Sequence, residues 1–383
     1  MIRKLPILFT HIISKFFPFI FRACPCPEPG TLLLVRLDGI GDYILFRNFI
    51  KALKLSKRFK GHHITLLGNP AWKDLAETLD YDDIDVFIWL TPDKFMRSPA
   101  YRYKKLKQIR SVCYETIISP VFSRDFECTD TLVKLVCARR KIGSTGDLSN
   151  TNIRQKRKGD RYYTTLIPGD GGVRFEFCRN REFFETLLEE RLELSRPEII
   201  LKQPVSLPVA GDYAVLFIGA GEKKRQWPLA HFSKAALFIH ETLGLNIVLC
   251  GGPGDRENAD KFSQLFPRPY TDLVGKTGLR ELPGIIKNGK LMVSNETAGP
   301  HLAAALGMPH IFVISNGNYL GRFSPYPKTM CKGYHLICHP EIRRYGYPSW
   351  LKIDDIGPEN LIEELERHLV QVTKNDDING RML

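Results

Sequence analysis

The chain has 383 residues, of which 43% are hydrophobic, and it carries 55 Lys and Arg against 42 Asp and Glu. The length excludes a single hydrophobic core and predicts two domains, and the hydrophobic fraction is that of a globular protein. The formal net charge of +13 favours anionic partners such as nucleotides, phosphorylated lipids or a membrane surface. The basic residues form short scattered runs with no recognisable nucleic-acid module, so we expect no nucleic acid partner.

The cysteines give no sign of a metal site. There are nine, no CxxC pair occurs, and Cys24 and Cys26 are too close for the usual zinc spacing. Free thiols in a reducing cytosol are the expectation, and the protein is predicted to be cytoplasmic.

The first 28 residues are predicted to be an amphipathic, membrane-associating segment. Residues 5–21 are apolar and aromatic, but Lys15 and Pro18 interrupt a run that is shorter than the ~20 residues a membrane span needs. No small-residue cleavage site follows, as a signal peptide would require. A helix lying in the membrane interface fits this pattern, and a helix packed on the protein's own surface is the alternative.

A strand-turn-helix unit then follows. The apolar strand at residues 32–35 leads into a turn with Gly39 and Gly41, which ends on Asp42 and an amphipathic helix. The glycines predict a sharp turn and a close approach to a ligand. Asp42 would then lie where open α/β sheets bind ligands, which suits a catalytic base. A helix cap is an equally good interpretation of Asp42.

Strands and helices alternate along the rest of the chain. The first half predicts strands at residues 63–68, 86–90 and 114–121 and helices after Pro70 and around residues 101–110, with a charged loop at 150–163. A connector at residues 203–211 is the candidate hinge. The pattern then restarts with strands near residues 212, 246, 291 and 310, helices at 232–244 and 301–306, and a last helix at 358–372. This order predicts two parallel sheets with helices on both faces.

Three blocks of sequence resemble one known family. They are LLLVRLDGIGDYILFRNFIKAL, GAGEKKRQWPLAHFSKAALFI and GKTGLRELPGIIKNGKLMVSNETAGPHLAAALGMP. From residue 31 to residue 309 the chain is similar to glycosyltransferase family 9, the bacterial lipopolysaccharide heptosyltransferases. The resemblance implies an α/β fold of the GT-B type, with two Rossmann-like doubly wound domains facing across a cleft. Residues 29–205 would be the acceptor domain and residues 206–383 the nucleotide-sugar donor domain, with the last helix a candidate to pack back on the first domain.

The resemblance also implies roles for single residues. Asp42 matches the family's general base, beside the substrate-binding Gly39 and Gly41. Arg225, next to Lys224, stands for the phosphate-binding lysine ahead of Trp-Pro, and a solvated loop residue is the alternative. The turn between residues 293 and 301 would bind the donor through backbone N–H groups. Its candidate residues are Glu296, Thr297, Ala298, Gly299 and His301.

That turn departs from the family pattern. The family prefers Asp-Ser/Thr-Gly here, whereas this chain has Glu296-Thr297-Ala298 with the glycine one place later. The shift changes the fine geometry of the turn, and the choice of donor depends on that geometry. His301 matches the family's histidine, and direct phosphate contact and a buried structural role are both open for it.

Neither a metal nor a cofactor is expected. Asp83 and Asp85 form an Asp-x-Asp pair, but they stand in an acidic run ahead of a strand and are better interpreted as a solvated turn. The glycine turns do not complete GxGxxG, and no phosphate-binding P-loop motif occurs. The resembled family needs no metal ion.

The sequence therefore predicts an inverting, metal-independent glycosyltransferase. The leading donor is ADP-heptose and the leading acceptor is a lipopolysaccharide core or a related anionic glycolipid or surface glycan. The enzyme would work in the cytoplasm, with peripheral contact at the inner face of the bacterial inner membrane. The alternative is a nucleotide-binding protein of the same fold without transferase activity, against which the intact Asp42 and Arg225 argue.

Overall fold

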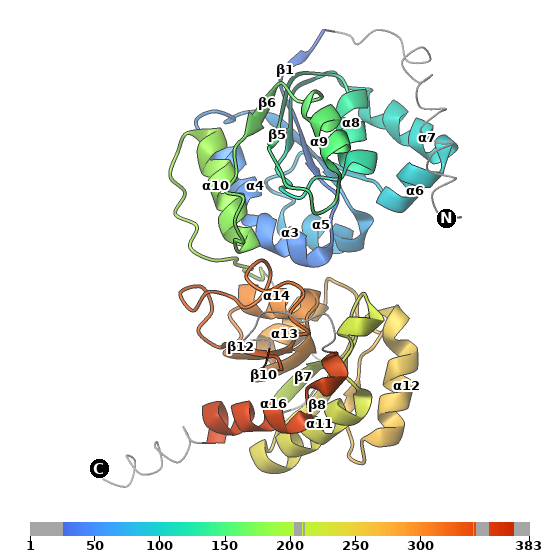
Figure 1. Ribbon diagram of the computed structural model, residues 1–383, viewed down its shortest axis with the longest axis vertical. Coiled ribbons are helices and arrows are strands. Elements are labelled where there is room, and N and C mark those ends of the chain that lie inside the picture. The colour runs from blue at the N-terminus through green and yellow to red at the C-terminus, as the bar shows by residue number, and fades with distance from the viewer. Residues whose placement is uncertain (1–25, 203–208, 210, 340, 342–351, 371–383) are drawn as a thin grey trace. The chain divides into compact units, whose positions relative to one another are not determined.

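The computed structural model describes residues 26–202, 209, 211–339, 341 and 352–370. The chain divides into two compact units, Met1–Leu194 and Ser195–Leu383, and each contains a six-stranded parallel sheet (Figure 1). The membrane-associating segment predicted for residues 1–28 lies outside the described residues except for its last three. The candidate hinge at 203–211 also lies outside them, apart from residues 209 and 211.

The sheet of the first unit has the strand order β3-β2-β1-β4-β5-β6. Its strands are β1 (Glu28–Arg36), β2 (His63–Gly68), β3 (Val86–Trp89), β4 (Tyr114–Ser119), β5 (Ala138–Ser144) and β6 (Thr165–Ile167). The α-helices are α3 (Ile40–Phe46), α4 (Asn48–Leu55), α5 (Lys73–Leu79), α6 (Pro92–Arg97), α7 (Pro99–Ile109), α8 (Thr131–Leu135), α9 (Ile153–Asp160) and α10 (Glu176–Leu188). Two short helical segments are η1 (Pro70–Trp72) and η2 (Phe126–Asp130).

Strand β1 lies in the middle of this sheet and is covered on both faces. Leu32, Leu33, Leu34 and Val35 have no exposed surface, although their side chains alternate between the two faces. Burial on both faces is what a parallel sheet with helical crossovers requires, and it explains the continuous apolar run in the sequence. The predicted parallel sheet is therefore confirmed.

The prediction of a loop at residues 150–163 is wrong, because the helix α9 occupies most of this segment. Asn152 caps this helix: its side chain accepts a hydrogen bond from the Gln155 backbone at 3.0 Å, and the Gln155 side chain accepts one from the Asn152 backbone at 3.3 Å. This capping box satisfies two backbone donors of the first turn. The charged residues that suggested a loop belong to a short surface helix.

We expect Asn152→Ala to loosen α9 without unfolding the unit. Loss of an N-cap acceptor costs about 1 kcal/mol, which corresponds to roughly fivefold faster hydrogen exchange of the α9 amides. Asn152→Asp keeps an acceptor and is the matched control. Unchanged exchange in the alanine variant would show that the capping box contributes nothing to α9.

The second unit has the strand order β12-β11-β10-β7-β8-β9. Its strands are β7 (Tyr213–Phe217), β8 (Asn246–Cys250), β9 (Thr271–Asp272), β10 (Leu291–Asn295), β11 (His310–Ile314) and β12 (Tyr334–Ile337). The α-helices are α11 (Leu229–Leu243), α12 (Arg256–Leu265), α13 (Leu282–Asn288), α14 (Ala298–Ala305) and α16 (Pro358–Leu365). The short helical segments are η3 (Lys223–Arg225), η4 (Pro253–Asp255), η5 (Ile353–Asp355) and η6 (Glu366–Val370).

The last helix packs into the core of this second unit. Leu361 and Leu365 of α16 are fully buried in the same apolar cluster as Ile239 of α11 and Ile337 of β12. The indole Nε1 of the buried Trp227 donates a hydrogen bond of 2.7 Å to the carbonyl of Ile356, just ahead of α16. These contacts attach the end of the described chain to α11 and to the edge strand β12.

In each sheet the strand order reverses once. The chain runs outward from β1 to β3, returns to β4 beside β1, and then runs outward on the other side. In the second sheet the same reversal separates β7 from β10. Loops diverge at such a switch point and leave room for a ligand at the carboxyl ends of the strands.

None of the helices in the described part of the chain combines the length and apolar character that a membrane span requires. Seven of the described cysteines are free thiols, as predicted, but Cys137 is disulfide-bonded, so the prediction of free thiols is wrong for that residue.

Candidate functional site

Asp42 lies at the carboxyl end of β1, next to the reversal of strand order in the first unit. It occupies the first turn of α3, whose N-cap is Gly39, and about a quarter of its side chain is exposed. Negative charge is favoured in the first turn of a helix, and exposure leaves the carboxylate accessible to a substrate. The N-cap position itself belongs to Gly39, so Asp42 is in the first turn and is not the cap residue.

A buried arginine holds the carboxylates around Asp42. Arg36, the last residue of β1, has no exposed surface, and its Nε donates a hydrogen bond of 2.8 Å to Asp38. Its Nη1 donates to the side chain of Asn180 at 3.2 Å, and its Nη2 lies 3.5 Å from Glu176 and 3.9 Å from Asp42. We refer to these five side chains as the Arg36 cluster.

Burial alone would lower the pKa of Arg36, but Asp38, Glu176 and Asp42 together raise it above its ordinary value. Burial raises the pKa of Asp38, and the neighbouring Arg36 charge opposes that rise. The guanidinium therefore stays charged in the interior because several carboxylates surround it.

The loop between β1 and α3 is fixed by the following strand-helix unit. The Asn69 side chain donates to the carbonyl of Leu37 at 2.9 Å, and the Trp72 indole donates to the carbonyl of Asp38 at 3.0 Å. Trp72 also stacks on Tyr43 of α3 with ring centres 4.5 Å apart. Tertiary contacts of residues outside the GIGD motif thus set the position of Asp42.

The two glycines of the turn are not required by backbone conformation. Gly39 has φ −77° and ψ −179°, and neither Gly39 nor Gly41 is among the residues with positive φ. A left-handed backbone is therefore not the reason for a glycine at either position. A Cβ on Gly39 would meet no atom closer than 3.6 Å, so the space beside the backbone is open to a ligand.

In the second unit, Arg225 and Glu296 lie together at the reversal between β7 and β10. Arg225 ends η3 after β7, and its Nη1 donates a hydrogen bond of 3.2 Å to the backbone carbonyl of Glu296, just after β10. Its guanidinium also lies 5.3 Å from the ring centre of Tyr319. The buried Nε of Arg225 has no hydrogen-bond partner among the described residues.

The Glu296 side chain points into the protein. It is 5% exposed, and its Oε2 accepts a hydrogen bond of 2.8 Å from the Ser315 hydroxyl. Burial raises the pKa of Glu296 above its ordinary value, although the Ser315 hydrogen bond and the Arg225 charge oppose the rise. Its Oε1 is buried without a hydrogen-bond partner in the described part of the chain.

The donor turn is shorter than predicted, because α14 begins at Ala298 and not at His301. Thr297 is the N-cap and makes no side-chain cap hydrogen bond. Gly299 is inside the helix, where a Cβ would lie 3.1 Å from the ring of Phe217 on β7. Close packing of α14 on the sheet explains this glycine.

His301 is buried in the second unit. Its Nδ1 lies 2.9 Å from the Tyr326 hydroxyl, and burial lowers the pKa of His301 to about 4. The imidazole is therefore neutral at pH 7. Of the two interpretations left open by the sequence, these contacts favour a histidine that holds the turn.

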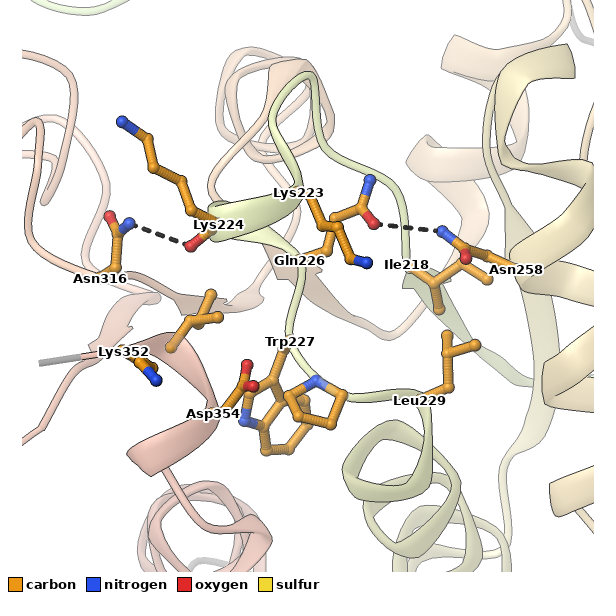
Figure 2. Close-up of a pocket in the computed structure, with 12 residues that line it drawn as sticks. Ile218, Lys223, Lys224, Gln226, Trp227, Leu229, Asn258, Asn316, Lys352 and Asp354 are labelled. Carbon is orange, nitrogen blue, oxygen red and sulfur yellow. Dashed lines mark hydrogen bonds between the residues drawn. The ribbon is translucent and has the colours of Figure 1, made fainter.

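The loop before α11 also borders a cavity of about 670 Å³ in the second unit (Figure 2). The Asn316 side chain donates to the carbonyl of Lys224 at 3.1 Å, and the Lys224 ammonium pairs with Glu222 at 3.0 Å. The lining residues are Ile218, Lys223, Lys224, Gln226, Trp227, Pro228, Leu229, Asn258, Asn316, Lys352, Ile353 and Asp354. Arg225, Glu296 and Thr297 are not among them, so this cavity adjoins the predicted phosphate site and does not contain it.

The Asp-x-Asp pair has a structural explanation. Asp85 accepts hydrogen bonds from the Lys54 ammonium at 2.8 Å and from the Ile64 backbone at 2.7 Å. Burial raises the pKa of Asp83, which lies in the preceding turn. Asp85 therefore fixes the start of β2 and is committed to protein contacts.

Sequence reasoning missed the residues that come to the site from distant parts of the chain. Glu176 and Asn180 reach Arg36 from α10, and Lys352 and Asp354 reach the cavity from the segment before α16. The arginine at the end of an apolar strand was a usable signal, since a charge there needs buried partners. No local sequence pattern indicates that Glu176, Asn180, Lys352 and Asp354 lie at these sites.

Comparison with known proteins gives the same assignment for the second half of the chain and for the fold. The model of glycosyltransferase family 9 (heptosyltransferase) matches residues 180–344. Lipopolysaccharide heptosyltransferase 1 of Escherichia coli K12 is 28% identical over 139 residues, which are 35% of this chain and 43% of that protein. The lipopolysaccharide core heptosyltransferase OpsX of Haemophilus influenzae is 27% identical over 109 residues, which are 28% of this chain and 31% of that protein. The matched segments span less than half of these relatives.

Solved structures extend the likeness in fold over most of the chain. A glycosyl transferase family 9 protein from Veillonella parvula has a TM-score of 0.67 at 18% identity, covering 90% of this chain and 98% of its own. The E. coli heptosyltransferase WaaC with ADP-2-deoxy-2-fluoro heptose has a TM-score of 0.67 at 17% identity, covering 88% of this chain and 99% of its own. The predicted GT-B fold, with two doubly wound domains, is confirmed by these likenesses. The family model and the sequence relatives thereby confirm the resemblance to glycosyltransferase family 9 that the sequence blocks indicated, with residues 180–344 matching the family model.

Proposed function

We propose that this chain is an inverting glycosyltransferase that transfers heptose from ADP-heptose to a lipopolysaccharide core or a related anionic surface glycan. The observation that carries the proposal is the placement of Asp42, a partly exposed carboxylate at the switch point of the first sheet. The corresponding point of the second sheet has Arg225, a cation suited to a diphosphate. The relative named as a WaaC structure binds an ADP-heptose analogue, which supports the choice of donor.

Asp42 is the proposed general base. Its carboxylate takes the proton from the acceptor hydroxyl as that oxygen forms a bond to the anomeric carbon of the sugar. The bond from the anomeric carbon to the diphosphate breaks in the same displacement, and the electron pair leaves with the nucleoside diphosphate. A single displacement inverts the anomeric centre and needs neither a covalent intermediate nor a second carboxylate.

The leaving diphosphate needs positive charge, and we assign that task to the protein. Arg225 supplies a charged guanidinium, and Lys223 and Lys224 lie in the same short helix. The backbone N–H groups that begin α14, after the N-cap Thr297, supply further donors. These groups replace the divalent cation that other transferases place on the diphosphate.

The acceptor is a membrane glycolipid in this proposal, so we place the enzyme in the cytoplasm, in peripheral contact with the inner membrane.

The competing function is nucleotide binding without transfer. Thermal shift with ADP, GDP, UDP and CDP identifies the base, and incubation with ADP-heptose with and without a core acceptor separates the two functions. Stabilisation by ADP without acceptor-dependent release of ADP would favour a binding protein.

Asp42→Asn tests the base. We expect the variant to keep its fold and donor affinity while kcat falls by ~10²–10⁴-fold, the usual contribution of general base catalysis. The matched control is Asp93→Asn, since Asp93 is an exposed carboxylate on α6 that pairs with Arg97. Turnover of Asp42→Asn close to that of the control would exclude Asp42 as the base.

Arg225→Ala tests the phosphate contact. Loss of a charge-assisted hydrogen bond costs about 1.5–3 kcal/mol, so kcat/KM for the donor is expected to fall roughly 10- to 150-fold. Arg225→Lys keeps the charge without the planar fork and is expected to be intermediate. Arg268→Ala removes an exposed arginine that pairs with Glu241 and is the control. If the donor kinetics of Arg225→Ala match those of Arg268→Ala, Arg225 does not contact the diphosphate and is only a solvated loop residue.

The source of the positive charge is tested with a chelator. Initial transfer rates in excess EDTA are expected to stay within about twofold of those with added Mg²⁺ or Mn²⁺, because protein cations stabilise the leaving diphosphate. The Asp83→Asn variant should behave in the same way. An enzyme that loses turnover in chelator and recovers with Mn²⁺ would overturn the metal-independent mechanism.

A further inference from the structure

Two histidines and a glutamate meet at the edge of the second sheet, in a part of the unit that the proposed reaction does not use. His335 is on the edge strand β12, Glu364 is in the last turn of α16, and His368 is in η6. The candidate ligand atoms of these three side chains all lie within 4.8 Å of one another. They form the one group of three possible metal ligands found among the described residues.

The cluster is made by tertiary structure from two separate segments. Glu364 and His368 are one helical turn apart, with Oε2 3.3 Å from Nε2. The ring of His335 packs against that of His368 with centres 4.0 Å apart. Bonds of ~2.0–2.1 Å in a tetrahedral site place two ligand atoms about 3.3 Å apart, so the Glu364–His368 pair already has the required spacing.

The neighbouring side chains hold the cluster in this arrangement. The His335 ring stacks on Phe312 of β11 with centres 4.8 Å apart, which fixes its plane. Arg367 binds Oε1 of Glu364, which leaves Oε2 facing His368. His310 lies one strand away, its ring 6.4 Å from that of His335, and its Nδ1 is buried with no hydrogen-bond partner in the described part of the chain.

We propose that His335, Glu364 and His368 bind a divalent transition-metal ion of the Zn²⁺ class, with water or His310 in the fourth position. Two imidazole nitrogens and one carboxylate oxygen suit Zn²⁺, Co²⁺ or Ni²⁺. Mg²⁺ and Ca²⁺ require oxygen ligands throughout and are not expected to bind here.

The bound ion would act as a clamp for the end of the second unit. It joins the edge strand β12 to the helical segment α16–η6, which is otherwise held by the apolar contacts of Leu361 and Leu365 and by the hydrogen bond from Trp227 to the Ile356 carbonyl. The segment η5, which lines the cavity of Figure 2, leads directly into α16. Metal binding therefore stabilises the wall of that cavity and takes no part in the displacement reaction. The inference is independent of the proposed function.

The test uses the full-length chain, freed of metal with a chelator and then titrated with Zn²⁺ or Co²⁺ alone. We expect one ion per chain at this site, together with a rise in Tm. Glu364→Gln and His368→Ala change partly buried side chains at the end of the unit, and each is expected to weaken binding at least about tenfold and to remove the rise in Tm. Their Tm without metal, compared with that of the parent chain, verifies that they are folded.

The matched control is His240→Ala, which removes a histidine of the same unit that contacts the Leu245 carbonyl. It should bind metal like the parent chain. The Co²⁺ complex should show visible d–d absorption without a thiolate-to-metal charge-transfer band, since no cysteine is a proposed ligand. Equal affinity in the parent chain, Glu364→Gln and His368→Ala would overturn the proposal. A thiolate band, or no stoichiometric binding by the parent chain, would also overturn it.

Discussion

The reversal of strand order in each parallel sheet is the constraint on which the candidate site depends. Because the connections leave β1 and β4 on opposite sides, the loops at their carboxyl ends separate, and the same holds for β7 and β10. Asp42 follows β1, and Arg225 and Glu296 follow β7 and β10. The reversal thus places the carboxylate of Asp42 at the switch point of the first sheet. In the second unit it places the guanidinium of Arg225 at the corresponding point. At both points the diverging loops leave room for a ligand.

In the first unit, the position of the carboxylate depends on a buried charge. A fully buried guanidinium is unfavourable unless anionic and polar groups surround it, and Arg36 obtains them from Asp38, Glu176 and Asn180. Because of this requirement, α10 packs against the end of β1. Asn180 of α10, for example, binds Arg36 although the two residues are 144 positions apart in the sequence. The loop that precedes Asp42 is therefore fixed before any substrate binds. Such pre-organisation suits the role of general base that we propose for Asp42, since a misplaced carboxylate loses much of its effect.

In the second unit, the departure from the family pattern has a physical consequence. A glutamate in place of aspartate is one methylene longer, and here it reaches inward to Ser315 of the segment after β11. Its backbone carbonyl, in contrast, accepts the hydrogen bond from Arg225. The backbone at this position orients the cation, while the side chain joins two adjacent loops. Substrate contact at this turn therefore falls to Arg225 and to the backbone donors of α14, in our proposal.

The sequence by itself determined the repeating strands and helices, because buried parallel strands are continuous apolar runs and helices have a regular apolar period. It also indicated Asp42 and Arg225 as candidate site residues, because they follow β1 and β7 in recognisable blocks. It contained the Asn152–Gln155 capping signal of α9, which the charge of that segment obscured. Tertiary structure alone decided the partners of Arg36, the burial of His301 and the meeting of His335 with Glu364 and His368. The physical reason is that period and capping act over a few residues, whereas the environment of a charged or titratable group depends on segments that only packing brings together.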